Sequence, residues 1–124
     1  MKRLTLFSFA LFAAYITIAQ NSQVSKHEKK VIRLVASLPE ILRANQYVMK
    51  HTNGKRKLST YIDCEPTSEH PHYHLSVSEF NGSALVPHFN FIVDAKTYEV
   101  KFWAVGEDKV LSLQAWRKRH YKDY

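Results

Sequence analysis

The fold is decided by residues 72–94, which read HYHLSVSEFNGSALVPHFNFIVD. Apolar residues alternate with polar ones on both sides of Asn81-Gly82-Ser83, a group of turn-forming residues, and this pattern is typical of a β-hairpin. Similar alternation and turn-forming connections elsewhere predict strands at 58–64, 72–80, 85–94 and 98–105, joined by 65–71, 81–83 and 94–97. We therefore expect a four-stranded antiparallel meander.

Alternation also assigns the two faces of this sheet. The residues expected on the buried side are Tyr73, Leu75, Val77, Phe89, Phe91, Val93, Val100, Phe102 and Ala104. An odd first loop, 81–83, brings Leu75 opposite Phe89 and so places Ser76 opposite His88. An even second loop, 94–97, matches Phe91 with Val100.

Helical spacing of apolar residues precedes the strands. Ser25 and Glu28 have the spacing of a capping box, which predicts a helix over about 26–37. A second helix, or a kinked continuation, is predicted to end near His51, where Asn53-Gly54 tolerates the positive φ of a helix C-terminus.

A short C-terminal helix is also expected, capped by Ser112 and holding Leu113, Trp116 and His120, with Trp116 in the core. The predicted fold class is α+β: an N-terminal helix or kinked helix pair packed on a four-stranded antiparallel meander, with a short C-terminal helix.

The chain begins with the layout of a secretory signal peptide. Lys2 and Arg3 precede an apolar run at 4–18, and small residues occur at Thr17 and Ala19. The run is shorter than the roughly 20 residues of a membrane-spanning helix. We predict a signal peptide at 1–19 and a single domain at 20–124, exported to the periplasm or secreted, with no transmembrane segment in the mature chain. An uncleaved signal anchor is the alternative.

The chain is basic, with 18 Lys and Arg against 11 Asp and Glu. Basic clusters, such as Lys55-Arg56-Lys57 and Arg117-Lys118-Arg119, favour an acidic partner or are solvated turns and helix faces. No nucleic-acid recognition motif accompanies them, so nucleic acid is not an expected partner.

The lone cysteine, Cys64, has no internal disulfide partner; we expect it to be buried at a strand end, with an intermolecular link or a reactive thiol as alternatives.

Histidines form the sharpest local pattern, His70-Pro71-His72-Tyr73-His74. Alternate residues of an extended chain project to one side, which is the arrangement that brings several imidazoles to one cation. With His88 diagonal to His74, the candidate metal ligands are His70, His72, His74 and His88, and the candidate ions are zinc, nickel and copper. The alternative is that these residues are polar groups on a solvated face.

The sheet face opposite the core, called here the outer face, is the candidate interaction surface. Its predicted contact residues are His74, His88, Asn90, Lys101 and Trp103, with Asn90 beside Lys101 and His88 beside Trp103. An exposed Trp among polar neighbours is typical of an interaction hot spot. The alternative is that a helix covers this face and buries Trp103.

The segment 89–101, FNFIVDAKTYEVK, resembles the closing hairpin of PepSY-type exported bacterial domains, which end in a strand, a V-D-x-x-T-G-x-V turn and another strand. Tyr98 stands where that family has glycine. The resemblance implies a cystatin-like fold, with helix packed on sheet, and a binding or peptidase-restraining role. Small NTF2-like domains also fit a helix on a curved sheet.

Catalytic signatures do not accompany this fold: there is no G-x-S-x-G elbow, and the three glycines leave little material for a phosphate or oxyanion loop. We therefore predict a non-enzymatic exported module that binds a protein or peptide partner, in a peptidase-restraining or immunity-type role. The alternative function is transition-metal binding by His70, His72 and His74.

Overall fold

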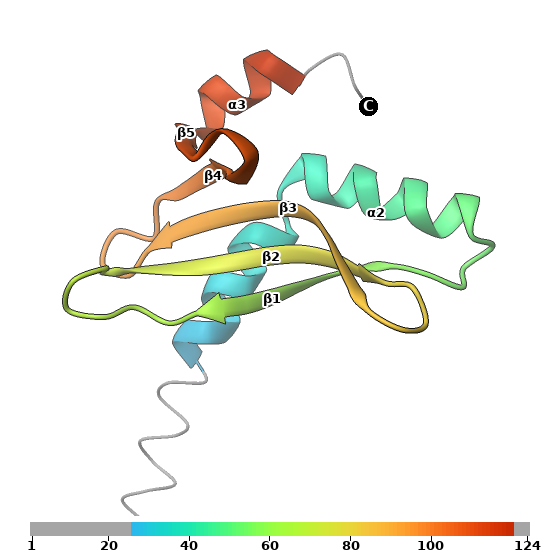
Figure 1. The fold of residues 1–124 in the computed structure, drawn as a ribbon, viewed down its shortest axis with the longest axis horizontal. Coiled ribbons are helices and arrows are strands. Elements are labelled where there is room, and N and C mark those ends of the chain that lie inside the picture. Colours follow the sequence, from blue (N-terminus) through green and yellow to red (C-terminus); the bar gives the residue numbers. More distant parts are fainter. Residues whose placement is uncertain (1–25, 121–124) are drawn as a thin grey trace, which may run out of the picture. The chain divides into compact units, whose positions relative to one another are not determined.

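The computed structural model describes residues 26–120, so the predicted leader at 1–19 and its cleavage point lie outside the described residues. Residues 26–36 are helical, and the chain from Val31 onward belongs to one compact unit. The elements that follow are α2 (Pro39–His51), β1 (Leu58–Cys64), β2 (His72–Phe80), β3 (Leu85–Asp94), β4 (Val100–Ala104), η1 (Val105–Glu107), β5 (Lys109–Ser112) and α3 (Leu113–His120) (Figure 1). No helix in this described part is long and apolar enough to span a membrane.

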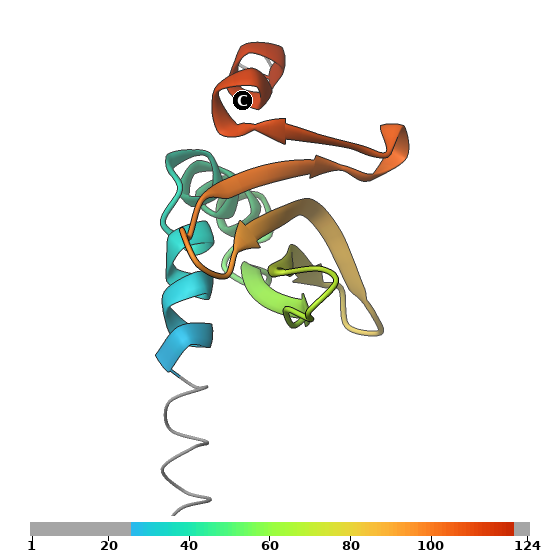
Figure 2. The same ribbon diagram turned by 90° about the vertical axis from the view of Figure 1, so that its left-hand side faces the viewer.

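The strands form one antiparallel sheet in the order β1-β2-β3-β4-β5, which confirms the α+β class and the meander. The sheet has a fifth strand that the sequence pattern did not predict. β5 pairs with β4, with Leu111 opposite Phe102, and the chain enters α3 directly from it (Figure 2). Four residues with mostly exposed side chains carry too short an alternation to be recognised from sequence.

The core lies between the helices and one face of the sheet, called here the inner face. Both helical segments before the sheet and α3 contribute to it. Its buried apolar residues are Val31, Val35, Leu38, Ile41, Ala44, Leu58, Leu75, Val77, Phe89, Phe91, Val93 and Trp116. The inner-face residues predicted on β2 and β3 are in this cluster or packed against it.

The end of α2 positions the first strand. Asn53 and Gly54 have φ values of 53° and 75°, and the Gly54 N–H donates to the Met49 carbonyl at 2.8 Å, as the predicted C-terminal cap requires. After the turn, the Leu58 N–H donates to Asn45 Oδ1 at 2.8 Å. This bond ties the start of β1 to the α2 helix.

The first hairpin has a different register from the predicted one. The loop has four residues, 81–84, rather than three, and Phe80 pairs with Leu85. A β-bulge adds one unpaired residue, His88, to β3 between the paired residues Pro87 and Phe89. As a result, Ser76 lies opposite Asn90 and not opposite His88. The predicted inner face is retained because loop and bulge together preserve the parity of the alternation.

The second hairpin is also shifted, by two residues. Phe91 pairs with Phe102 rather than with Val100, and Lys101 pairs with Ile92 rather than with Asn90. The turn is longer because Asp94 Oδ1 accepts the backbone N–H groups of Lys96 and Thr97, at 2.8 and 2.9 Å. Tyr98 then adopts a left-handed φ of 60° before pairing begins, a conformation that glycine favours.

The C-terminal helix α3 packs where the sequence predicts. Ser112 Oγ accepts the Ala115 N–H at 3.0 Å, which is the expected N-cap bond. Trp116 is 2% exposed and stacks on Phe102 with ring centroids 4.8 Å apart. Arg117 Nε donates to Glu40 Oε1 at 2.6 Å and so links α3 to α2.

Candidate functional site

The outer face of the sheet is the candidate functional site. The helical core residues, including Val35, Ile41 and Trp116, pack with inner-face side chains, so over residues 31–120 the helices cover the inner face. Trp103 remains partly exposed. The alternative in which a helix covers the outer face and buries Trp103 is therefore wrong for the described part of the chain.

Two histidines near the start of β2 meet on this face. His72 Nε2 and His74 Nε2 are 3.0 Å apart, and the two rings stack with centroids 4.9 Å apart. Burial, followed by the neighbouring imidazoles of His72 and His70, holds the pKa of His74 below its ordinary value of 6.5, against the opposing effect of Asp63. His74 is therefore a neutral imidazole at neutral pH.

Trp103 reaches from β4 across β3 to this pair. Its ring meets His74 edge to face, with centroids 5.1 Å apart and an interplanar angle of 76°. The residue that the structure places beside Trp103 is thus His74, and not His88 as predicted. Asn90 and Lys101, two other predicted contact residues, lie on the same face, with Lys101 paired to Ile92.

A hollow of about 240 Å³ opens on the outer face next to His72. Its lining consists of His72, Ile92, Asp94, Glu99, Lys101 and Val110. The backbone N–H groups of Thr97 and Lys96 donate hydrogen bonds to Asp94 and hold the pKa of its carboxyl group below the ordinary value. This carboxylate is therefore already hydrogen-bonded within its own turn. No ion pair involves Lys101 among residues 26–120, and its ammonium group is the cation that the hollow offers.

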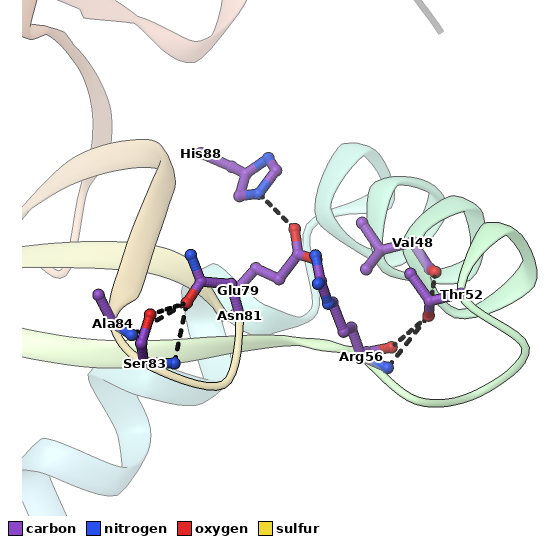
Figure 3. Close-up of polar contacts among 8 residues, drawn as sticks. All are labelled: Val48, Thr52, Arg56, Glu79, Asn81, Ser83, Ala84 and His88. Carbon is purple, nitrogen blue, oxygen red and sulfur yellow. Dashed lines mark hydrogen bonds and ion pairs between the residues drawn. The ribbon is translucent and has the colours of Figure 1, made fainter.

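His88 belongs to a different site. Because the bulge adds one residue to β3, the His88 side chain turns to Glu79 and bonds its Oε2 through Nε2 at 2.9 Å (Figure 3). The other carboxylate oxygen of Glu79 accepts from Arg56 Nη1 at 3.4 Å. Glu79 and His88 border a cavity of about 270 Å³, whose lining is Ala44, Tyr47, Val48, His51, Thr52, Leu58, Glu79, His88 and Phe89.

The predicted grouping of His74 with His88 is therefore wrong. His70, His72 and His74 follow one another, with the His70 and His72 ring centroids 5.9 Å apart. Within residues 26–120, no three His, Cys, Asp or Glu side chains are gathered closely enough to hold a metal ion together. The part of the predicted set that the structure brings into direct contact is the pair His72 and His74.

Cys64 is exposed, so the prediction that it is buried is wrong. It ends β1, an edge strand, just after a register shift between Ile62 and Cys64, and it pairs with His74. A residue at the end of an edge strand has a neighbour on one side only, which leaves the thiol open to solvent.

Sequence reasoning missed several residues of the hollow. Ile92 and Asp94 share the parity of Asn90, so the alternation already placed them on the outer face. Val110 was missed because β5 was not predicted. Glu99 lies in the turn between β3 and β4, whose length was underestimated.

Comparisons with family models, with curated proteins and with solved structures find no match to this chain. The geometry of the outer face therefore supplies the basis for a functional proposal.

Proposed function

We propose that this protein is an exported, non-enzymatic binding module that recognises an acidic, apolar-containing segment of a protein or peptide through the outer face of its sheet. The observation that carries the proposal is Trp103, partly exposed and held edge to face by His74, on a sheet face that the helices of residues 31–120 leave uncovered. The signal-peptide pattern at 1–19 supports export.

Trp103 suits the role of an anchor. Tryptophan offers a large amphipathic contact area with few rotatable bonds, and it is enriched among the residues that dominate binding energy. Contact with His74 restricts the indole before any partner arrives, which lowers the entropy lost on binding. A partner side chain that packs on Trp103 therefore meets a pre-organised surface.

Lys101 and the adjoining hollow give the surface its chemical preference. The hollow has room for one side chain and has Ile92 and Val110 as apolar walls. The lining also holds the carboxylates of Asp94 and Glu99, and Asp94 is already bonded to the backbone of its own turn. The Lys101 ammonium group is the group of the lining that would pair with an acidic group on the partner, in keeping with the basic character of the whole chain. Together these features select a segment that carries an apolar side chain next to a carboxylate.

A displayed library of random peptides, selected on immobilised protein, tests this function. Recovered peptides should combine acidic with aromatic or aliphatic residues. Trp103→Ala and Lys101→Glu should each weaken their binding, Trp103→Ala by about 30-fold, which corresponds to a hot-spot loss of about 2 kcal/mol.

Two matched variants control for the loss of any exposed aromatic or any exposed cation. Tyr47→Ala removes an aromatic residue that is 60% exposed on α2, and Lys118→Glu reverses an exposed charge on α3. Both should bind the selected peptides as the wild type does. Selection of no peptide, or of peptides that bind all four variants equally, contradicts the proposal.

A further inference from the structure

The His72 and His74 pair has the geometry of two ligands of one metal ion. The residues are two apart on β2, so both side chains project from the outer face. Their Nε2 atoms are 3.0 Å apart. Bonds of about 2.0–2.1 Å to a common ion, meeting at about 90–110°, place two imidazole nitrogens about 2.9–3.4 Å apart.

We propose that His72 and His74 form a binding site for a divalent first-row transition-metal cation, with Cu²⁺ the most tightly bound and Ni²⁺ and Zn²⁺ weaker. The measured separation of the two nitrogens lies within the range for neighbouring ligands, so an ion that binds both takes the place of the hydrogen bond between them. Imidazole nitrogen suits all three metals, and the order of affinity follows the general preference of nitrogen sites.

The surroundings decide what kind of site this is. No third metal-ligating side chain joins the pair closely enough among residues 26–120. Water therefore fills the remaining positions of the ion, which leaves the metal open to ligands from solution. The site is one of modest affinity and open coordination, unlike a closed structural centre with four protein ligands.

Trp103 provides a direct report of occupancy. Its ring centroid is 5.1 Å from that of His74. Cu²⁺ is paramagnetic and quenches indole fluorescence at short range. A Cu²⁺ ion bound to this histidine pair therefore lowers the fluorescence intensity of Trp103. The second tryptophan, Trp116, is in the core and 2% exposed.

The experiment titrates Cu²⁺, Ni²⁺ and Zn²⁺ into tag-free protein expressed from the full chain, followed by tryptophan fluorescence for Cu²⁺ and by calorimetry for all three. Every sample carries Cys64→Ser, because the exposed thiol otherwise reacts with Cu²⁺. We expect saturable binding of one ion and saturable quenching by Cu²⁺. Trp103→Phe should lose the quenching and retain the binding.

Histidine variants locate the ligands. His72→Gln and His74→Gln should each weaken binding, and the double variant should lose it. His51→Gln, which removes an exposed histidine on α2, should bind as the parent does. His88→Gln should also bind normally, because His88 bonds Glu79. Far-UV circular dichroism in the presence of EDTA checks the fold of each variant.

The proposal is overturned by absence of saturable binding to the parent protein at micromolar metal, or by a folded double variant that binds as the parent does. If the double variant does not fold, the two single variants decide: unchanged affinity in both overturns the proposal. The titrations contain no peptide, so their outcome is independent of the partner-binding function.

Discussion

Replacing Trp116 with alanine tests whether α3 is seated in the core as described. Trp116 stacks on Phe102 and meets Phe89 and Phe91 edge to face, with ring centroids 6.1 and 5.5 Å away. A buried tryptophan removes about 150–250 Å² from water. At about 25 cal/mol per Å² this is worth about 4–6 kcal/mol, and partial collapse of the cavity brings the expected loss to about 3–5 kcal/mol.

Urea denaturation followed by far-UV circular dichroism measures this loss. With a slope of about 1–1.5 kcal/mol per M, the unfolding midpoint of Trp116→Ala should fall by about 3 M. Trp116→Phe keeps one ring against Phe102 and should lose only about 1–2 kcal/mol. Gln114→Ala, at an exposed position of α3, serves as the control and should change the free energy of unfolding by less than about 0.5 kcal/mol. A loss below about 1 kcal/mol in Trp116→Ala would refute the packing argument.

Two further predictions concern the contacts that hold the helices to the rest of the fold. Asn45→Ala leaves the Leu58 N–H without its acceptor and should cost about 1–2 kcal/mol in urea denaturation, whereas Gln46→Ala, on the exposed side of α2, should cost almost nothing. Burial by itself raises the pKa of Glu40, but its hydrogen bond and ion pair with Arg117 hold that pKa below its ordinary value of 4.5. The lowered pKa means that ionised Glu40 stabilises the fold above about pH 4.5 and loses this effect as the pH falls through the lowered value. The wild type should therefore be more stable than Glu40→Gln by up to about 1 kcal/mol at neutral pH; the effect is small because Arg117 is partly exposed. The difference in free energy of unfolding should vanish in acid. A difference that grows in acid contradicts the assignment.

Local sequence patterns predict the elements of this fold well. The limits of β1, β2 and β3 follow from alternation because each strand has one buried face and is bounded by turn-forming residues. The C-terminal end of α2 follows from the cap at Gly54, and the N-terminal end of α3 follows from the cap at Ser112. These features depend on neighbouring residues alone, which is why sequence is sufficient for them.

Register is less predictable, because it depends on how two distant segments meet. Parity fixes the face of each residue but leaves shifts of two residues undecided. The bulge at His88 and the left-handed backbone of Tyr98 produce such shifts. A histidine does not by itself indicate a bulge, and a tyrosine does not by itself indicate a positive φ. The candidate site was affected most: His74 and Trp103 were placed on the correct face, but the contact between them required the true register.

The accessibility of Trp103 in the folded protein decides whether the outer face is open for binding. Trp116→Phe leaves Trp103 as the single tryptophan, and acrylamide quenching of its fluorescence measures its exposure. We expect efficient collisional quenching of Trp103 in the folded protein, and weaker quenching when a selected peptide is added. Quenching as weak as that of a core tryptophan, or unchanged by a bound peptide, would contradict the claim.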